Sequence, residues 1–496
     1  MSSVVSVTDQ IESSYESYSL KVIQDRAIPH AYDGLKPVQR KLLYAMYDLG
    51  LLSNSQHRKS ARVIGETIGK YSPHGDISAY EALVRLVQDF TTRYPLASGQ
   101  GNWGTDEHPA AAHRYTEVRL SKVGHLLLQA VEDNTVDFVT NFDGSTTEPV
   151  LLPSPLPTLL LNGASGIAVG LSTSIPSHNL GDVLDTTIAL LVDPELTVEE
   201  LLPFIAGPDF PKGGLICNES LHQIYSTGNG SVRVKVRAHL EKRLNDPHRY
   251  IVITHLGILD KVKMLEKFVQ VLNDKLVPQI KSIEDESKGD DTRVVIQLKQ
   301  TTEDYYIVWK KIVKTVGLVQ SFKVNMIALI DEFPHRLNLK QLLTYWIETR
   351  VKVVERLFKY KIEKLQRQLQ TTQTYLKIVA DKKKILKLIM DSETQEDIVA
   401  GLLKLKFQDF EVEQVLNTPI RRLSKLSEAE LQNTYNEQLT KLTSFQQVIQ
   451  STSSIKDYIH QELETFRTQF GDKRKCEIQD VKTFDKFDLP MIRTKE

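Results

Sequence analysis

The segment Ala110-Ala-Ala-His-Arg-Tyr-Thr-Glu-Val-Arg-Leu120 sets a tyrosine beside an arginine, shortly after the glycine-rich stretch Gly99-Gln-Gly-Asn-Trp-Gly104. A phenol has a pKa of about 10, so only about one in a thousand is ionised at neutral pH. A tyrosine nucleophile therefore needs an adjacent cation or base, and a guanidinium also binds phosphate oxygens as a planar fork. Arg114 and Tyr115 indicate a tyrosine that attacks a phosphate; the alternative is an ordinary buried tyrosine beside a surface arginine.

The bulk composition is that of a multidomain protein of a reducing compartment. A chain of 496 residues with 41% hydrophobic residues is long enough for two to four domains. Cys217 and Cys476 are far apart and lack metal-ligand spacing, which argues against a disulfide framework or a zinc site. The N-terminus has no basic start, and no apolar run of about 18 residues follows. We therefore predict a cytoplasmic protein without a membrane-inserted segment.

The net charge of −1 hides an uneven distribution. Between residues 21 and 70 there are nine Lys or Arg residues and four Asp or Glu residues. A nucleic-acid-binding surface needs basic residues focused on one face. This segment predicts such a face; the alternative is an ordinary solvated helix surface.

The same region has the outline of a helix-turn-helix. Apolar residues three and four apart predict an amphipathic helix over 36–50 that ends at Gly50; they are Val38, Leu42, Leu43, Met46 and Leu49. A second helix is predicted over 60–70, followed by a turn at Ser72-Pro73-His74-Gly75. Asp76 is predicted to cap a third helix, with an apolar stripe of Tyr80, Leu83, Val84 and Val87. This pattern also occurs in proteins that never bind DNA.

Two further sequence patterns follow along the chain. From about residue 150, strands are predicted at 232–236, 250–254 and 294–298 in a separate α/β domain, with 281–291 as a charged, exposed loop. Beyond Asn338 two coiled-coil-like runs are predicted to pair as an antiparallel hairpin; two helices of a bundle are the alternative. Their seam residues are Ile362, Leu365, Leu369, Leu376 and Val379 in the first run and Leu442, Phe445, Ile449, Ile459, Leu463, Phe466 and Phe470 in the second. The apolar segment between them predicts a small helical head suited to a symmetric dimer contact.

Several ordered motifs resemble the A subunit of bacterial type IIA topoisomerases, that is, DNA gyrase and topoisomerase IV. They are Gln24-Asp-Arg-Ala-Ile-Pro29, Asp33-Gly-Leu-Lys-Pro-Val-Gln-Arg40, Arg58-Lys-Ser-Ala-Arg62, Gly69-Lys-Tyr-Ser-Pro-His-Gly-Asp76, the two segments around Tyr115 quoted above, Asn162-Gly-Ala-Ser-Gly-Ile-Ala-Val-Gly170 and Gly471-Asp-Lys-Arg-Lys-Cys-Glu-Ile478. The resemblance covers almost the whole chain. It implies a multidomain α+β fold with five parts: a winged-helix (helix-turn-helix) DNA-binding and catalytic tyrosine domain at 1–150, an α/β tower domain at 151–337, a long antiparallel coiled coil at 338–382 and 423–475, a helical exit-gate dimerisation head at 383–422 and a tail at 476–496.

The resemblance also implies the chemistry. Tyr115 would attack a DNA phosphodiester and stay linked to the 5′ phosphate, so that a second duplex passes through a double-strand break. Arg114 would stabilise the developing phosphate charge. Arg26 and His74 would contact phosphate or transfer a proton to the leaving hydroxyl; the alternative for His74 is a turn residue bonded to the backbone.

DNA contacts follow by the same resemblance. Phosphate contacts are implied for Lys36, Arg40, Lys41, Arg58, Lys59 and Arg62. Ile167 would be an apolar wedge between base steps, whereas its place in a glycine-rich strand favours a buried residue. Ile77 and Glu81 occupy positions associated in the family with fluoroquinolones. Ile77 stands where Ser is typical, and we predict low drug sensitivity.

Cofactors and partners are expected outside this chain. No compact Asp/Glu cluster suggests a metal site, and Gly65-Glu-Thr-Ile-Gly69-Lys70-Tyr71 lacks the spacing and hydroxyl of a phosphate-binding loop. The resemblance implies that Mg²⁺ and ATP are bound mainly by a B subunit, in an A2B2 complex built on a homodimer that acts on double-stranded DNA in the cytoplasm, with the nucleoid.

Departures from the family pattern leave alternatives open. Ser72, Lys41 and His113 stand where many members have His, Arg and Met. No basic, glycine-containing box precedes Glu496, which favours a relaxing and decatenating enzyme of the topoisomerase IV type; a truncated gyrase A core is similar. Two other classes remain: an architectural DNA-binding protein of the same fold, and a single-chain nuclease or recombinase using Tyr115.

Overall fold

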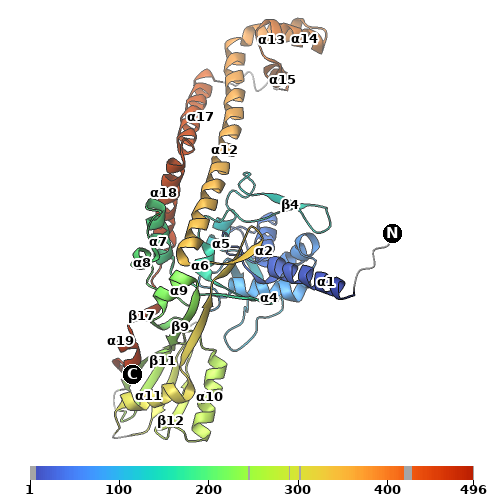
Figure 1. The fold of residues 1–496 in the computed structure, drawn as a ribbon. Coiled ribbons are helices and arrows are strands. Elements are labelled where there is room, and N and C mark those ends of the chain that lie inside the picture. Colours follow the sequence, from blue (N-terminus) through green and yellow to red (C-terminus); the bar gives the residue numbers. More distant parts are fainter. Residues whose placement is uncertain (1–6, 244–245, 290, 301–302, 418–426, 495–496) are drawn as a thin grey trace. The chain divides into compact units, whose positions relative to one another are not determined.

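The computed structural model describes residues 7–243, 246–289, 291–300, 303–417 and 427–494. They form two compact units, and each is described here by itself. The first comprises Met1–Val131, Val136–Arg350 and His460–Glu496, and the second comprises Glu132–Thr135 and Val351–Ile459. Helices and strands are mixed along the first unit and helices fill the second, as the predicted α+β class requires (Figure 1). None of the described helices is long and apolar enough to cross a membrane.

The N-terminal part of the first unit is mainly helical, with a small antiparallel sheet of order β1-β3-β2. Its elements are α1 (Val7–Val22), the π-helical turn η1 (Ile23–Ala27), α2 (Pro37–Asp48), β1 (Arg58–Lys59), α3 (Ser60–Glu66), the π-helical turn η2 (Thr67–Tyr71), α4 (Asp76–Val87), β2 (Ala97–Gln100), β3 (Glu117–Leu120) and α5 (Lys122–Leu127). Helices α2, α3 and α4 pack on one another.

Helix α2 forms where the sequence predicts it. Pro37 supplies the first helical residue, and the Gln39 side chain accepts a hydrogen bond of 3.0 Å from the Lys36 backbone N–H. Leu42, Leu43 and Met46 are fully buried. Gly50 then takes a φ of +69°, which side chains other than glycine adopt at a cost, and the helix ends before it.

The next two predicted helices are also present, with two corrections. Asp76 is the first residue of α4 rather than its cap, because Gly75 holds the cap position without a side-chain bond. The buried face of α4 is Ala79, Leu83 and Leu86 rather than the predicted stripe around Tyr80 and Leu83, which shifts the helix by about one residue around its axis. Tyr80 is left at the edge of this face.

A six-stranded sheet of order β17-β8-β9-β14-β7-β6 forms the middle of the first unit. The elements from residue 138 to 235 are β4 (Phe138–Thr140), β5 (Thr147–Pro149), α6 (Thr158–Asn162), β6 (Ala164–Ile167), β7 (Ser172–Ile175), α7 (Leu180–Val192), α8 (Val198–Leu201), β8 (Gly214–Cys217), α9 (Leu221–Thr227) and β9 (Asn229–Lys235). Strand β6 is an edge strand, paired with β7 in a hairpin. This hairpin carries one of the predicted DNA-contacting residues, Ile167.

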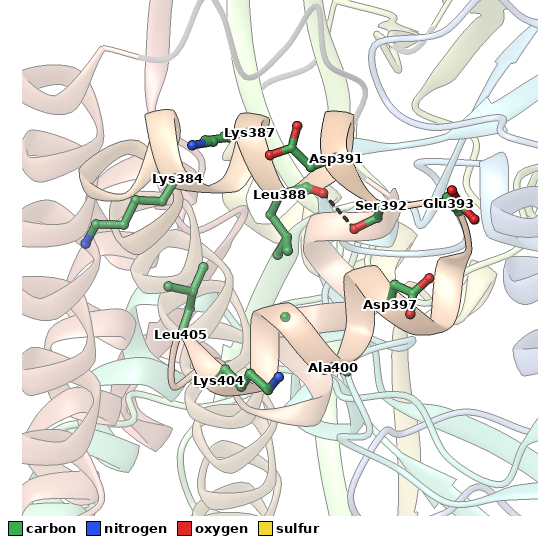
Figure 2. A pocket seen from close by; sticks show the side chains of 11 residues that line it. Lys384, Lys387, Leu388, Asp391, Ser392, Glu393, Asp397, Ala400, Lys404 and Leu405 are labelled. Atoms are coloured by element: carbon green, nitrogen blue, oxygen red, sulfur yellow. Dashed lines mark hydrogen bonds between the residues drawn. The ribbon is translucent and has the colours of Figure 1, made fainter.

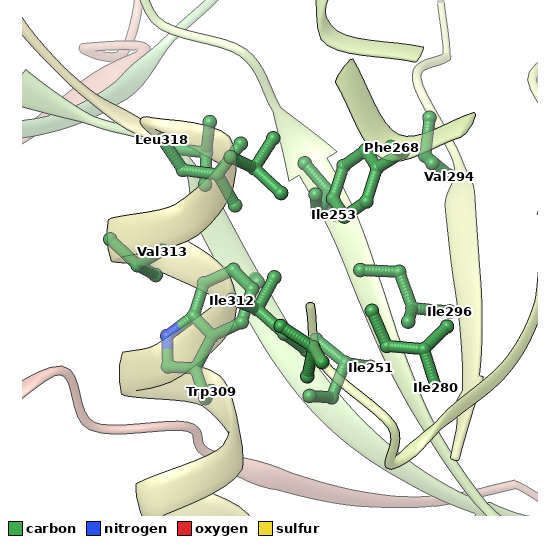
Figure 3. Close-up of a cluster of buried hydrophobic side chains, with 14 of the residues drawn as sticks. Ile251, Ile253, Phe268, Ile280, Val294, Ile296, Trp309, Ile312, Val313 and Leu318 are labelled. Carbon is green, nitrogen blue, oxygen red and sulfur yellow. The ribbon is translucent and has the colours of Figure 1, made fainter. Parts of the chain in front are cut away.

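A five-stranded sheet of order β12-β13-β11-β10-β18 lies beyond it. The elements of this region are β10 (Arg237–Arg243), β11 (Arg249–His255), α10 (Lys261–Asn273), β12 (Ile280–Asp285), β13 (Val294–Leu298), α11 (Tyr305–Val316), β14 (Val319–Asn325), β15 (Ile327–Ile330) and β16 (Phe333–Arg336). Figure 3 shows Trp309 and Ile312 of α11 directed toward Ile251 of β11, with Phe268 of α10 beside Val294 of β13. The three strands predicted at 232–236, 250–254 and 294–298 are confirmed as β9, β11 and β13.

The predicted loop over 281–291 is wrong in its first half. Lys281 to Asp285 belong to β12, which pairs antiparallel with β13 at the edge of the sheet. Charged residues are common on edge strands because they discourage pairing with other chains, so the charge signalled an edge rather than a loop.

The segment expected as a polar tail is part of both sheets. Strand β17 (Cys476–Gln479) pairs parallel with β8, and β18 (Met491–Thr494) pairs parallel with β10. Between them lies α19 (Val481–Lys486), whose Phe484 is buried. Strands contributed from so far along the chain leave no local sequence pattern that identifies their partners.

The second unit contains most of the long helix α12 (Leu339–Ala380), together with α17 (Glu428–Val448) and the start of α18 (Thr452–Phe470). Helices α12 and α17 run antiparallel, since Phe358 contacts Phe445 while the Thr372 hydroxyl lies 3.0 Å from Gln438 Oε1 (Figure 1). The expected seam residues Ile362, Leu365 and Leu369 are buried. The predicted start of the second run at 423 lies outside the described residues.

Three short helices follow α12: α13 (Lys382–Asp391), α14 (Gln395–Lys404) and α15 (Asp409–Asn417). They enclose a core of Ile378, Ile385, Leu402, Phe407, Val412 and Val415. Figure 2 shows a shallow groove between α13 and α14, with Leu388 and Leu405 at its floor and lysines and acids along its rim. Met390 is 84% exposed on this group of helices.

Candidate active site and DNA-contacting surface

Tyr115 lies in a turn immediately before β3. Its backbone N–H donates a hydrogen bond of 2.8 Å to the Ala112 carbonyl, and its side chain is 63% exposed. Arg114 is exposed beside it. The alternative of an ordinary buried tyrosine therefore does not hold for this side chain.

The Arg114 guanidinium acts on the phenol in two ways. Its central carbon lies 4.8 Å from the centre of the Tyr115 ring. A hydrogen bond from the guanidinium, and secondly its positive charge, lower the pKa of the Tyr115 phenol. Both effects favour the phenolate, which is the form that attacks phosphorus.

The turn carrying Tyr115 caps the N-terminus of α3. The backbone N–H of Ser60 donates to the Thr116 carbonyl at 3.0 Å, and that of Ala61 donates to the His113 carbonyl at 3.2 Å. Two of the N–H groups that a helix leaves without partners are thereby satisfied, although α3 has no side-chain cap. The tyrosine and the start of α3 are consequently held in one local structure.

Three predicted phosphate-contacting residues surround this junction. Arg58 and Lys59 form β1, paired with Val118 and Glu117 of β3, and Arg62 follows in the first turn of α3. All three side chains are exposed. Lys59 also forms an ion pair of 2.9 Å with Glu117.

Two other predicted contacts lie elsewhere. Arg40 is buried in a double ion pair with the fully buried Asp33, with Nε–Oδ2 and Nη2–Oδ1 distances of 2.6 and 3.0 Å. Lys41 donates to the Tyr71 carbonyl at 2.5 Å and pairs with Glu148 at 3.1 Å. Their positions argue against the phosphate contacts predicted for them, because each charge is already engaged inside the protein.

Ile167 ends strand β6 and is 86% exposed, so the strand-based expectation of burial is wrong. The hairpin is anchored just before it. The Lys36 Nζ donates a hydrogen bond of 2.6 Å to the Ser165 carbonyl, and a Cβ on Gly166 would lie 2.1 Å from the Ala27 carbonyl oxygen. Burial, and secondly the charge of Arg85, lower the pKa of Lys36.

Arg26 and His74 are both exposed. Arg26 lies in η1, where the Ile28 N–H reaches the Ile23 carbonyl at 3.4 Å, and His74 lies in the turn between η2 and α4. Such π-helical turns are uncommon and often occur at functional sites. Within the described residues, no hydrogen bond joins either side chain to Tyr115.

Ile77 and Glu81 are one turn apart on α4, and both are exposed, Ile77 to 71%. His113 lies nearby, with its Nε2 3.8 Å from the Asp76 carboxylate. The first turn of α4 therefore faces the segment that carries the tyrosine.

Three hydroxyl groups next to the Tyr115 segment belong to residues that were not predicted as site residues. The Tyr80 hydroxyl lies 2.9 Å from Thr116 Oγ1, which donates to Ser60 Oγ at 2.8 Å. The only sequence signal is that Thr116 directly follows Tyr115, because residues from three distant segments make this contact.

The described part of the chain contains no group of three or more His, Cys, Asp or Glu side chains placed to hold a metal ion. The carboxylates near Tyr115 do not converge, since Asp76 lies 3.8 Å from His113 and Glu117 pairs with Lys59, and the Arg114 guanidinium does not ligate metals. By themselves, these described residues do not fit a Mg²⁺ site.

Comparison with known proteins shows the family of the chain. Residues 26–464 match the family described as the A subunit of DNA gyrase/topoisomerase IV. The chain is 39% identical over 482 residues to the DNA gyrase A subunit of Thermotoga maritima, covering 96% of this chain and 59% of the relative. It is 37% identical over 479 residues to the DNA gyrase A subunit of Clostridium acetobutylicum, covering 96% of this chain and 58% of that relative. The chain thus spans little more than half the length of these relatives. The match and the two identities show that this chain belongs to the family of DNA gyrase/topoisomerase IV A subunits.

Proposed function

We propose that this chain cleaves and religates DNA as the A subunit of a type IIA topoisomerase. The observation that carries the proposal is the exposed Tyr115 phenol beneath the Arg114 guanidinium, which lowers its pKa. A nucleophile that must reach a duplex has to be exposed, and a phenol needs a cation to act near neutral pH.

The proposed reaction is a transesterification. The Tyr115 phenolate oxygen forms a bond to phosphorus, and the bond from phosphorus to the 3′ oxygen breaks. The 3′ oxygen leaves and takes up a proton, while the phosphate stays on the 5′ end as a phosphotyrosine. Arg114 balances the charge that develops on the phosphate oxygens. Because one ester replaces another, the reverse step reseals the strand.

Arg26 and His74 are proposed to assist at the phosphate. Both are exposed; Arg26 lies within the π-helical turn η1, and His74 lies in the turn that follows η2. An imidazole has a pKa range suited to giving the leaving 3′ oxygen its proton. Replacing His74 with Gln and measuring the cleavage rate against pH would test this role; an unchanged profile would contradict it.

The DNA-contacting surface is proposed to be a winged helix made from α3, α4 and the β1-β3-β2 sheet. Arg58, Lys59 and Arg62 supply phosphate contacts, and Ile167 supplies the wedge. Arg40 and Lys41 drop out of this set because their charges are engaged inside the protein. Lys36 shares its ammonium with the Ser165 carbonyl.

The remaining parts of the enzyme are proposed to come from partners. A B subunit would bind Mg²⁺ and ATP, and two copies of this chain would meet through the helices α13, α14 and α15, where Met390 is exposed. The five-stranded sheet and its helices would be the tower. The expected complex is A2B2, acting on chromosomal DNA in the cytoplasm to relax or decatenate it.

The decisive experiment mixes this chain with a compatible bacterial B subunit, Mg²⁺ and supercoiled or catenated DNA, and stops the reaction with detergent. We expect protein linked to 5′ DNA ends with the unsubstituted chain, and no linked protein with Tyr115→Phe. Tight DNA binding without an adduct, with a B subunit known to support cleavage by a relative of this chain, would instead favour an architectural DNA-binding protein.

A further inference from the structure

The segment 111–116 is held from behind by the side chain of Tyr80, which projects from α4. The Tyr80 hydroxyl shares its proton between two acceptors, the Ala111 carbonyl at 2.5 Å and Thr116 Oγ1 at 2.9 Å. One phenol therefore contacts the chain both before and after the Arg114–Tyr115 pair. Its ring centre is 6.0 Å from that of Trp103 and 5.7 Å from that of His113, which limits its rotation.

A second anchor comes from α3. Thr116 is fully buried, and its hydroxyl donates to Ser60 Oγ at 2.8 Å. The backbone N–H of Ser60 donates to the Thr116 carbonyl at 3.0 Å. Tyr80, Thr116 and Ser60 thus form a row of hydroxyls that joins α4, the tyrosine segment and α3. We refer to these three residues as the hydroxyl clamp.

The clamp is built to hold the backbone and not to reach the reaction. The side chains of Thr116 and Ser60 are buried, whereas that of Tyr115 projects into solvent. Burial raises the pKa of Tyr80, so its hydroxyl keeps the proton that it donates to the Ala111 carbonyl. The clamp hydroxyls therefore hold the backbone, whereas the Tyr115 phenol is the reactive group.

We propose that Tyr80 is a positioning residue for Tyr115, fixing the segment 111–116 so that the phenol oxygen meets the scissile phosphate in the attacking geometry. This rests on the proposed cleavage function. Positioning a nucleophile converts a bimolecular step into an effectively unimolecular one, and a misplacement of about 1 Å costs on the order of 100-fold in rate. Because the phenol is exposed on a turn, its backbone is what the protein has to fix.

The test measures the single-turnover cleavage rate with DNA and B subunit in saturating amounts. The variants are Tyr80→Phe, which removes the clamping hydroxyl, and Thr116→Val, which removes its partner with little change of shape. We expect each to cleave about 10- to 100-fold more slowly, with DNA affinity unchanged. The double variant should be slower by less than the product of the two effects, because both remove one shared contact.

Two matched variants separate positioning from stability. Thr116→Ser keeps the hydroxyl and should keep the rate. Tyr225→Phe also removes a buried tyrosine hydroxyl, one that lies 2.9 Å from His178 Nε2, but far from this segment, and should leave the rate unchanged. The thermal unfolding midpoint is recorded for every variant, and rates are measured well below it.

The outcomes distinguish the two ideas. No adduct from the unsubstituted chain would remove the proposed function, and this inference with it. An adduct that forms equally fast in Tyr80→Phe would overturn the positioning role alone. Equal slowing in Tyr80→Phe and Tyr225→Phe would also overturn it, since general destabilisation would then explain the loss.

Discussion

Arg114 illustrates how a single side chain changes the chemistry of its neighbour. The guanidinium lies over the ring of Tyr115 and lowers the pKa of its phenol. A lysine ammonium would supply charge, but not the planar fork that can also bind two phosphate oxygens. We therefore expect Arg114 to favour the phenolate before attack and to bind the phosphate during it.

Replacing Arg114 with Gln should slow cleavage by about 100- to 1000-fold, the usual effect of removing one preorganised group that stabilises developing charge. The pKa of Tyr115 should also rise, because the group that lowers it is gone. Less phenolate then exists at any given pH, and the rising alkaline limb of the cleavage rate should move to higher pH. Single-turnover rates across pH check this, with Arg62→Gln expected to weaken DNA binding without moving the limb.

Ile77 is a second residue whose side chain alone is expected to set a property of the chain, its sensitivity to fluoroquinolones. It is exposed one turn before Glu81 on α4, and it offers no hydroxyl to a ligand there. We expect Ile77→Ser to lower the fluoroquinolone concentration needed to trap cleavage complexes by roughly five- to tenfold, since a hydrogen bond contributes about 1 kcal/mol or slightly more. Titration of drug-trapped DNA breaks measures this. Full sensitivity in the unsubstituted chain, unchanged by the substitution, would contradict it.

At the scale of elements, the β6–β7 hairpin shows how a backbone contact sets the position of an exposed side chain. Gly166 lies so close to the Ala27 carbonyl that any Cβ would clash, and Lys36 bonds the adjacent Ser165 carbonyl. The hairpin is held firmly up to the residue before Ile167. A wedge between base pairs requires such support, because unstacking a step costs a few kcal/mol.

An Ile167→Ala variant should therefore bend DNA less. A duplex labelled with a dye at each end should show lower energy transfer when saturated with the variant than with the unsubstituted chain. Val192→Ala serves as the control, since Val192 is also exposed, to 70%, but lies at the end of α7. Equal energy transfer for all three proteins would exclude the wedge.

Helices α12 and α18 are joined near their bases by a buried ion pair. Arg350 is only 4% exposed, and its Nη2 lies 2.7 and 2.8 Å from the two Glu462 carboxylate oxygens. Its Nη1 also donates to the Pro153 carbonyl at 3.0 Å. Removing one partner leaves an uncompensated buried charge, which is costlier than the pair itself is favourable.

The substitution Glu462→Gln should lower the free energy of unfolding of the first unit by about 3–5 kcal/mol. Arg467→Gln, also on α18 and in the first unit, breaks a more exposed pair with Asp185 and should cost less than about 1 kcal/mol. Urea unfolding followed by tryptophan fluorescence compares the two. Similar, small losses in both variants would show that water screens the Arg350 pair.

At the scale of the whole molecule, the segment 471–494 ties distant parts of the first unit together. It adds one strand to each of the two large sheets, and the dark red C-terminal trace in Figure 1 follows this path. Phe484 lies between them, with Lys235 Nζ 4.5 Å and the Arg233 guanidinium carbon 5.1 Å from its ring centre. Burial is the main cause that lowers the pKa of Lys235 to about 8.

We expect Phe484→Ala to destabilise the first unit by about 3–5 kcal/mol, through the cavity it leaves and the loss of both cation contacts. Phe333→Ala, at a residue that is 60% exposed, is the control and should cost little. The measurement is urea unfolding, together with the rate of proteolysis within 471–494. Unchanged proteolysis would mean that the two strands hold the segment without Phe484.

Features that depend on neighbours along the chain could be predicted from the order of the residues. The spacing of Leu42, Leu43 and Met46 predicts a buried helix face, because it follows the period of a helix. The run of β-branched residues from Ile251 to Ile253 predicts a buried strand. The adjacency of Arg114 and Tyr115 likewise supplies a candidate cation for the phenol, and the ordered motifs indicated the family.

The contacts between side chains from distant segments became known from the folded chain. Folding buried Arg40 against Asp33, exposed Ile167 at a hairpin end, joined Tyr80 to Thr116 and made sheet strands of the expected tail. Such contacts join residues far apart in sequence, and their energies depend on burial and on distances of a few ångströms. Neither burial nor these distances can be read from the local spacing of apolar residues, so these features of the site follow only from the folded chain.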